Sequence, residues 1–422
     1  MYDLTTLTNG LRVLSVTLPE ARSVSLGIFL AVGSRHENEA LAGASHFIEH
    51  MMFKGTERRP TALAIAEAIE GRGGIFNAST GLEMTLYWAK VAAAHLPEAL
   101  DVMSDMLLHA TFAPAEIEKE RAVINEEISY TLDTPDSLAQ ILVNQLQWPN
   151  HPLGRDVAGT QESVAALSRE SLLAYMGDHY RPGEAILGLA GLVDHQQAVA
   201  WAESYLGAWK PGPSVPWEPA PPEHRGPSLH VEFKATEQAH LSFSFAGLSR
   251  DNPDRFALRL LNVILGEGMR SRLFQKVREE LGLAYSVDSY VGTLQDTGMV
   301  GMYAGVGAGR TEEAITAILD ELDRLRQEPV PREEMDKALE FTKGRLALSL
   351  EDSFTVAAWY ARQQLRGMEV LEPEELIARI EAVQAEDIQR LAQALFQEEK
   401  LHLAIVGPFS QNGERFRHCI RF

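Results

Sequence analysis

Hydrophobic and polar residues alternate in short runs along both halves of the chain, as they do in strands that place one face against a core. In the first half these runs cover residues 11–18, 22–32, 84–91 and 185–193. In the second half they cover residues 229–234, 239–247, 284–292, 297–306 and 401–407. They are rich in β-branched and aromatic residues and are often bounded by glycine or proline, so each run predicts a strand.

Other segments repeat their apolar residues every three to four positions, which is the period of an amphipathic helix. The helical segments are residues 96–109, 114–130, 195–209, 254–265, 311–327 and 331–350. Short strands next to long helices predict an α+β fold, in which helices pack on a largely antiparallel sheet.

A proline-rich stretch separates the two halves. Residues 211–228 read PGPSVPWEPAPPEHRGPS and contain seven of the 20 prolines of the chain. Because proline fixes φ and has no amide donor, this stretch predicts an extended, semi-stiff linker. We therefore expect one domain at residues 1–210 and a second at residues 229–422, a division that suits a chain of 422 residues.

The two halves also resemble diverged copies of one unit. A shift of 215 residues places Ser34-Arg35 on Ser249-Arg250, and each pair directly follows an apolar strand. The same shift brings the helical segment 114–130 close to residues 331–347. Since the order of the elements matches as well, we interpret the halves as homologous domains.

Composition excludes several classes of function. The net charge is −21, from 38 basic and 59 acidic residues, which disfavours nucleic acids and anionic membrane surfaces as partners. The single cysteine, Cys419, excludes an internal disulfide framework and a cysteine-rich metal site. We see no signal peptide and no apolar run near the roughly 18 residues of a membrane helix, so we expect a cytoplasmic protein.

One motif carries recognisable chemistry. Residues 46–50 read HFIEH within a segment that contains no helix breaker until Gly55. In a helix, His46 and His50 lie one turn apart on the same face, where two imidazoles can bind one zinc ion. Glu49 borders that face and could take a proton from a water molecule at the metal. This is the inverted, H-x-x-E-H order of the zinc-protease motif.

Such a site needs a third protein ligand, and the acidic helix at residues 114–130 is the best source. Its apolar residues Ile117, Val123, Ile124 and Ile128 mark the face that we expect to be buried. Glu120 and Glu127 lie within that stripe, whereas Glu126 is rotated by about 100° from its neighbour. We therefore favour Glu127 over Glu126 as the ligand, with Glu120 as a nearby carboxylate that orients a histidine or helps the metal site.

Several segments together resemble the pitrilysin/insulinase family of zinc peptidases, closest to the short-chain branch that includes the mitochondrial processing peptidase. They are HFIEHMMFKGT, ERAVINEEI, GGIFNAST and, at residues 268–287, GMRSRLFQKVREELGLAYSV. The similarity extends over nearly the whole chain. It implies a half-clamshell of two homologous α+β domains, each a largely antiparallel sheet packed with helices.

The resemblance implies roles for individual residues of the zinc motif. His46, His50 and Glu127 match the zinc ligands, Glu49 matches the general base, and Glu120 matches an additional acidic residue on the ligand helix.

Two further groups of residues match positions that contact the substrate in the family. Arg278 and Tyr285 match an Arg–Tyr pair near the scissile bond. Phe76, Asn77 and Ala78 lie in the stretch at 75–80 that matches the substrate-binding edge strand.

We therefore expect a zinc-dependent endopeptidase that acts on unfolded peptides or short protein segments. The shift of 215 residues places HFIEH opposite residues 261–265, LNVIL, so one zinc ion per chain is expected. Short members of the family dimerise, which predicts a homodimer, with a heterodimer containing a related subunit left open. The alternative is a non-catalytic or partner-dependent subunit of a heteromeric peptidase assembly.

Overall fold

The computed structural model describes residues 2–222, 226–410 and 413–420. These residues group into two compact units, and neither unit is continuous along the chain. The first unit consists of residues 1–128, 156–218 and 347–370, and the second consists of residues 129–155, 219–346 and 371–422. Within residues 211–222 there is no helix or strand, and residues 223–225 of the expected linker lie outside the described residues.

The first unit is built on a six-stranded sheet with the order β1-β2-β6-β3-β5-β4. Its strands are β1 (Asp3–Thr6), β2 (Arg12–Thr17), β3 (Ser23–Leu30), β4 (Ile75–Thr80), β5 (Thr85–Ala92) and β6 (Ala185–Gly191). Only β2 and β6 pair in parallel, and the other neighbours are antiparallel. The sheet is therefore largely antiparallel, as the strand patterns predict, and β4 forms one of its edges.

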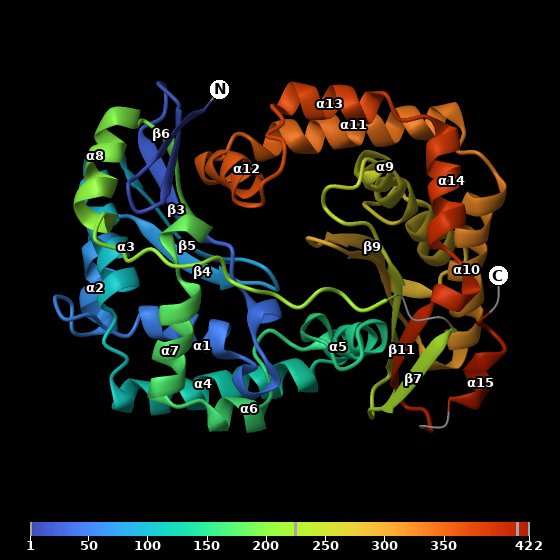
Figure 1. The fold of residues 1–422 in the computed structure, drawn as a ribbon. Coiled ribbons are helices and arrows are strands. Elements are labelled where there is room, and N and C mark those ends of the chain that lie inside the picture. Colours follow the sequence, from blue (N-terminus) through green and yellow to red (C-terminus); the bar gives the residue numbers. More distant parts are fainter. Residues whose placement is uncertain (1, 223–225, 411–412, 421–422) are drawn as a thin grey trace. The chain divides into compact units, whose positions relative to one another are not determined.

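Helices cover both faces of this sheet because its strands point alternate apolar residues to opposite sides. Leu26 and Ile28 of β3 belong to the core on one face, which also contains residues of α1 (Ala44–Met52), α3 (Leu96–His109) and α8 (His195–Leu206). The other helices of this unit are α2 (Ala62–Ile69), α6 (Gln161–Ala166), α7 (Arg169–His179) and the first part of α4 (Pro114–Asp133). Phe29 points to the opposite face, which α12 (Ser353–Leu365) covers (Figure 1).

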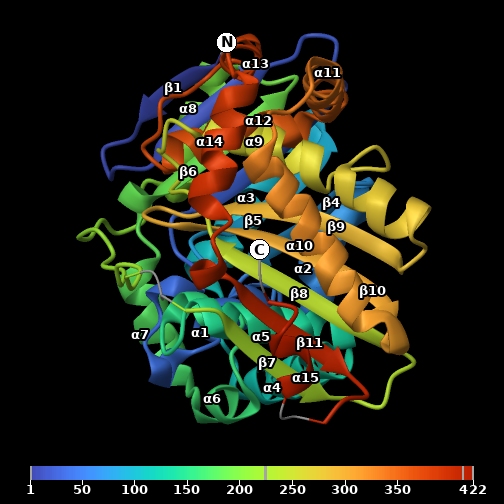
Figure 2. The same cartoon turned by 90° about the vertical axis from the view of Figure 1, so that its right-hand side faces the viewer.

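The second unit repeats this architecture with a five-stranded sheet in the order β7-β11-β8-β10-β9. Its strands are β7 (Ser228–Phe233), β8 (Gln238–Ala246), β9 (Ala284–Thr293), β10 (Gly298–Gly307) and β11 (His402–Gly407). Its helices are α5 (Pro135–Gln147), α9 (Arg255–Leu265), α10 (Thr311–Gln327), α11 (Arg332–Ser349), α13 (Pro373–Glu381), α14 (Ala385–Leu395) and α15 (Glu414–Arg417). Residues of α10 and α14 belong to the same core as those of β8, β10 and β11, and Figure 2 shows α10 crossing in front of the strands.

The two sheets have the same topology, which supports the interpretation of a duplicated unit. The order β2-β6-β3-β5-β4 in the first sheet corresponds to β7-β11-β8-β10-β9 in the second, including one parallel pair at the same place. A shift of 215 residues takes the start of β3 at Ser23 to the start of β8 at Gln238. The same shift takes the start of α3 at Leu96 to the start of α10 at Thr311.

Each half of the chain supplies one helix to the sheet of the other half. Helix α12, from the second half, packs on β3 and β6 of the first sheet, where Ser353 and Ser25 share a 2.8 Å hydrogen bond. Helix α5, from the first half, packs on β8 and β11 of the second sheet, where the Gln147 amide donates to the Gly298 carbonyl. Each compact unit therefore contains one helix from the other half of the chain.

Every predicted strand and helix forms, with ends that differ by a few residues. The sequence patterns missed β1, α2, α5, α6, α7, α12, α13, α14 and α15. The expectation that Val123 lies on the buried face of its helix is wrong, because its side chain is 43% exposed, while Ile117, Ile124 and Ile128 are buried. Among the described residues, no helix has the length and apolar character needed to span a membrane.

The close packing of α12 on β6 predicts a large effect of one small substitution. Gly188 of β6 lies against α12, and a Cβ atom at this position would be 3.0 Å from the Cβ of Ala361 and 3.1 Å from the Phe29 ring. We expect Gly188→Val to lower the free energy of unfolding by about 1–3 kcal/mol through overpacking, as measured by urea denaturation.

Gly177 in α7 is the matched control, because a Cβ there would meet nothing within 4 Å. Gly177→Ala should raise the free energy of unfolding by about 0.5–1 kcal/mol, since alanine favours the helix. An unchanged midpoint for Gly188→Val would show that α12 does not pack closely on this sheet.

Candidate metal centre and active site

Helix α1 presents the two histidines of the motif, and its own anchoring is strong. Phe47, Ile48 and Met51 are fully buried in the core of the first unit. At the N-terminus of the helix, the buried Glu37 carboxylate accepts hydrogen bonds from the amides of Gly43, at 2.8 Å, and Ser45, at 2.7 Å. A carboxylate in this position satisfies free amides and complements the helix dipole, so the orientation of α1 is fixed from both sides.

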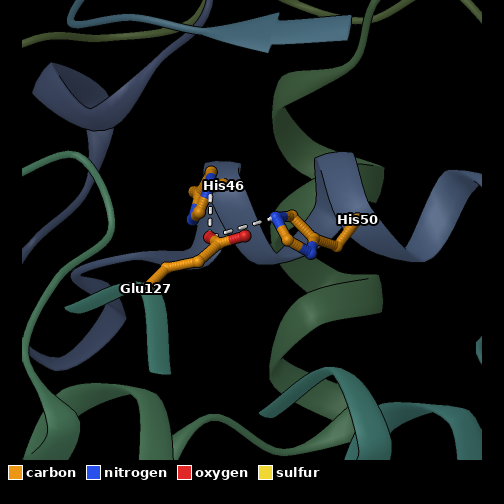
Figure 3. A group of neighbouring side chains, drawn as sticks. All are labelled: His46, His50 and Glu127. Atoms are coloured by element: carbon orange, nitrogen blue, oxygen red, sulfur yellow. Dashed lines mark ion pairs between the residues drawn. The ribbon is translucent and has the colours of Figure 1, made fainter. Parts of the chain in front are cut away.

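His46 and His50 point from one face of α1 toward the carboxylate of Glu127 on α4. The two rings lie 4.6 Å apart between centroids and meet edge to face. The Oε2 atom of Glu127 is 3.7 Å from Nε2 of His46 and 3.6 Å from Nε2 of His50 (Figure 3). The structure thus brings together the three residues that the sequence proposed as ligands.

The donor set fits a zinc ion. The separations of 3.6 and 3.7 Å exceed those of hydrogen bonds, so the three groups converge without bonding to one another. Two imidazoles and one carboxylate make up a common ligand set of catalytic zinc sites, in which a fourth position stays open. Burial, with a smaller contribution from His50, lowers the pKa of His46 to about 4. This imidazole is therefore neutral at pH 7, as a metal ligand must be.

Glu120 orients His50 through the ring nitrogen that does not face Glu127. The Nδ1 atom of His50 lies 3.1 Å from Oε2 of Glu120, whose side chain is only 6% exposed. A proton on Nδ1, donated to this carboxylate, leaves the lone pair of Nε2 directed toward Glu127. His46 has no such support, because its buried Nδ1 atom lacks a hydrogen-bond partner among the described residues.

Sequence reasoning missed Lys54, which completes this arrangement. Its ammonium group lies 2.7 Å from Oε1 of Glu120, on the oxygen that His50 does not use. A buried carboxylate is stabilised by such a counter-ion. The position of Lys54, four residues after His50, was the available signal.

Glu49 lies beside the histidine pair and is held by the neighbouring strand. The hydroxyl of Thr80, the last residue of β4, donates a hydrogen bond to Oε2 of Glu49. Burial raises the pKa of Glu49, and the hydrogen bond from Thr80 and the proximity of His50 oppose this effect. The carboxylate thus has one oxygen fixed by Thr80 and lies close to His50 and Glu127.

The neighbouring glutamates of α4 have different surroundings. Glu127 faces the two histidines, although its side chain is 47% exposed. Glu126 is exposed and is absent from the group of converging ligands. A step of one residue along α4 rotates the side chain by about 100°, and this rotation separates the carboxylate of Glu127, which faces the histidines, from that of Glu126, which faces outward.

Phe76, Asn77 and Ala78 lie on β4 at the edge of the first sheet. The Gly81 amide donates a hydrogen bond to the Met84 carbonyl, so these two residues form a hydrogen-bonded pair where β4 turns into β5. In antiparallel strands such pairs alternate with pairs that share no hydrogen bonds. The backbone groups of Phe76, Ala78 and Thr80 consequently point away from β5. The side-chain oxygen of Asn77 accepts a 2.8 Å hydrogen bond from the outward amide of Ala78.

Arg278 and Tyr285 come together in the second unit. Arg278 lies in a π-helical segment, Phe274–Glu280, and Tyr285 lies on β9 at the edge of the second sheet. The guanidinium group donates to the Tyr285 carbonyl at 2.6 Å, and its carbon is 4.8 Å from the centre of the Tyr285 ring. The Tyr285 side chain is 77% exposed, so its hydroxyl is available to a ligand.

Both halves of the chain match families of peptidases. Residues 12–161 match the family described as Insulinase (Peptidase family M16), and residues 166–341 match the Peptidase M16 inactive domain. An uncharacterized zinc protease of Bacillus subtilis is 37% identical over 408 residues, which cover 96% of this chain and 97% of that protein. The chain belongs to the M16, or insulinase, family of peptidases.

Another M16 relative, an uncharacterized zinc protease of Rickettsia felis, is 34% identical and covers 98% of this chain and 99% of its own length. Solved structures share the fold. A protease from Helicobacter pylori superimposes with a TM-score of 0.92 at 22% identity, over 97% of this chain and 99% of that one. A chain of Complex III2 from Candida albicans has a TM-score of 0.84 at 20% identity and full coverage of both chains.

The two adjacent glutamates of α4 provide a matched test of the metal centre. We expect Glu127→Gln to lower the affinity for zinc by more than about 100-fold, because a neutral amide replaces the charged ligand. Glu126→Gln should leave the affinity unchanged. Competition with a chromogenic chelator measures both, and elemental analysis of the unaltered protein should give one zinc ion per chain. Equal affinities of the two variants would reject Glu127 as a ligand.

Proposed function

We propose that this protein is a zinc-dependent endopeptidase that cleaves peptide bonds in unfolded peptides or short protein segments. The observation that carries this proposal is the convergence of His46, His50 and Glu127, with the carboxylate of Glu49 fixed beside them. Membership of a peptidase family and relatives named zinc proteases support the same reaction. The complete set of ligands disfavours the alternative of a non-catalytic subunit.

The residues of the site divide the chemistry among them. Zinc bound by His46, His50 and Glu127 would supply a Lewis acid and lower the pKa of a coordinated water toward about 7. Glu49 accepts the proton of the attacking water and returns it to the leaving amine. Glu120 keeps His50 in the tautomer that presents Nε2, and Lys54 holds Glu120 in place.

The substrate binds as an additional strand along β4. This edge offers the outward backbone groups of Phe76 and Ala78 to an extended peptide, once the side chain of Asn77 releases the Ala78 amide. Backbone pairing reads the conformation of the substrate more than its sequence. Most strands of a folded protein are already paired on both sides, so the proposed substrate is an unfolded peptide or a short exposed segment.

Arg278 and Tyr285 complete the reaction by contacting the substrate. The exposed phenol of Tyr285 can donate a hydrogen bond to a carbonyl oxygen on which negative charge develops, and Arg278 can clamp a carbonyl or carboxylate. The protein acts as a homodimer in this proposal, with a heterodimer containing a related subunit as the other arrangement. Arg278 and Tyr285 then act on the active site of either their own chain or the partner chain.

Substitution of the general base tests the mechanism. We expect Glu49→Gln to lower kcat on a fluorogenic unfolded peptide by about 100- to 10,000-fold, since proton transfer is lost. Zinc content should stay at the level of the unaltered protein, because Glu49 is not a ligand. Glu67→Gln on α2, an exposed carboxylate in the same unit, serves as the control. Full activity of Glu49→Gln, or unaltered activity after removal of zinc by a chelator, would reject the proposal.

Mixing two inactive variants tests the dimer. One variant is Glu49→Gln and the other is Arg278→Ala, and each alone should show little activity. If Arg278 serves the partner chain, co-refolding the two in equal amounts should restore roughly a quarter of the original activity, because half of the dimers then contain one intact site. The absence of restored activity, with mixed dimers demonstrated by differently tagged chains, would show that Arg278 serves its own chain.

A further inference from the structure

Thr80, the last residue of β4, is connected both to the proposed general base, Glu49, and to the strand edge that would bind the substrate. Its side chain lies on the same face of the strand as those of Phe76 and Ala78, the half-buried face, and β4 packs on α1. From there its hydroxyl donates a hydrogen bond to Oε2 of Glu49. Among the described residues, Thr80 is the one hydrogen-bond donor to this carboxylate.

The backbone of the same residue belongs to the free edge of the sheet. Because Gly81 pairs with Met84, Thr80 faces Thr85 in a pair without hydrogen bonds between the strands. The amide and carbonyl of Thr80 therefore point outward, in line with those of Phe76 and Ala78. A peptide that extends the sheet along β4 would meet the backbone of Thr80 as the last position of the edge.

We propose that Thr80 is a positioning residue that couples the register of a peptide bound along β4 to the carboxylate of Glu49. The inference depends on the proposed function, since it assigns Thr80 a part in that reaction. One residue holds the base through its side chain and borders the substrate through its backbone. The hydroxyl occupies Oε2 and leaves Oε1 of Glu49 for the proton of the attacking water.

The physical basis is the conformational freedom of glutamate. Three rotatable bonds allow the Glu49 carboxylate to swing away from its working position, and packing of α1 fixes only the start of the side chain. Threonine is restricted at χ1 because it is branched at Cβ, so its hydroxyl is a stiff support. Loss of a hydrogen bond to a charged group of this kind corresponds to about a 10- to 100-fold loss of rate.

The test compares Thr80→Val, which keeps the shape but removes the donor, with Thr80→Ser, which keeps the donor. We expect Thr80→Val to lower kcat about 10- to 100-fold while KM for an unfolded peptide changes less than about 3-fold. Thr80→Ser should restore most of kcat. Zinc affinity, measured by chelator competition, should be equal in all three proteins, because Thr80 contacts no zinc ligand.

Thr17→Val is the matched control for Thr80→Val. Thr17 also ends a strand of the first sheet, and its hydroxyl donates a 2.9 Å hydrogen bond to the carbonyl of Val193, away from the site. It should retain the original kcat. A second control combines Thr80→Val with Glu49→Gln, where the loss of Thr80 should add nothing to the residual rate, since it acts only through Glu49.

The outcomes separate the two proposals. Absence of zinc-dependent hydrolysis in the unaltered protein would overturn the proposed function and, with it, the role of Thr80. An active protein in which Thr80→Val keeps the original kcat would overturn the role of Thr80 alone. That role is equally overturned if Thr80→Val acts only on KM, if it lowers zinc affinity, or if Thr80→Ser is as slow as Thr80→Val.

Discussion

The anchoring of α1 is the constraint on which the candidate site depends. His46 and His50 take their spacing from one helical turn, so the side to which both point is set by the orientation of the helix. The buried face of α1 and the Glu37 cap at its first turn fix that direction. A helix free to rotate by one residue, about 100°, would carry both histidines away from Glu127. The convergence of these three side chains is thus a consequence of core packing.

Duplication explains why the scaffold supports a site in one unit and none of these ligands in the other. The strand order is the same in the two sheets, and α9 includes the residues that the shift of 215 places opposite HFIEH. There, Leu261 and Leu265, which fall opposite His46 and His50, are buried in the core of the second unit. Apolar residues therefore stand at the positions of the histidine pair, and this helix packs without the cost of buried imidazoles.

Local patterns in the sequence predict most of the fold and the three side chains that converge at the candidate metal centre. Alternation identifies strands such as β3, and the phase of apolar residues on α4 singles out Glu127 from Glu126, because both signals are local. The same phase places Val123 inside, yet this residue is exposed, since the stripe on α4 is narrower than the apolar pattern. Local patterns cannot predict that α5 packs on the second sheet and α12 on the first. Periodicity shows that one face of a helix is apolar, but it does not show which sheet that face will cover.

Contacts between residues far apart in the chain were predictable only in part. The phase of α4 pointed to Glu120 as a partner of a histidine, and it meets His50 across 70 residues. No local pattern links Thr80 to Glu49 across 31 residues, or Lys54 to Glu120. Once these contacts are known, the formal charges around the site can be compared with its proposed occupant. Lys54 pairs with Glu120, so the formal negative charges of Glu49 and Glu127 remain beside the two histidines. A divalent cation balances these two charges, and this balance is the electrostatic reason that the site suits zinc.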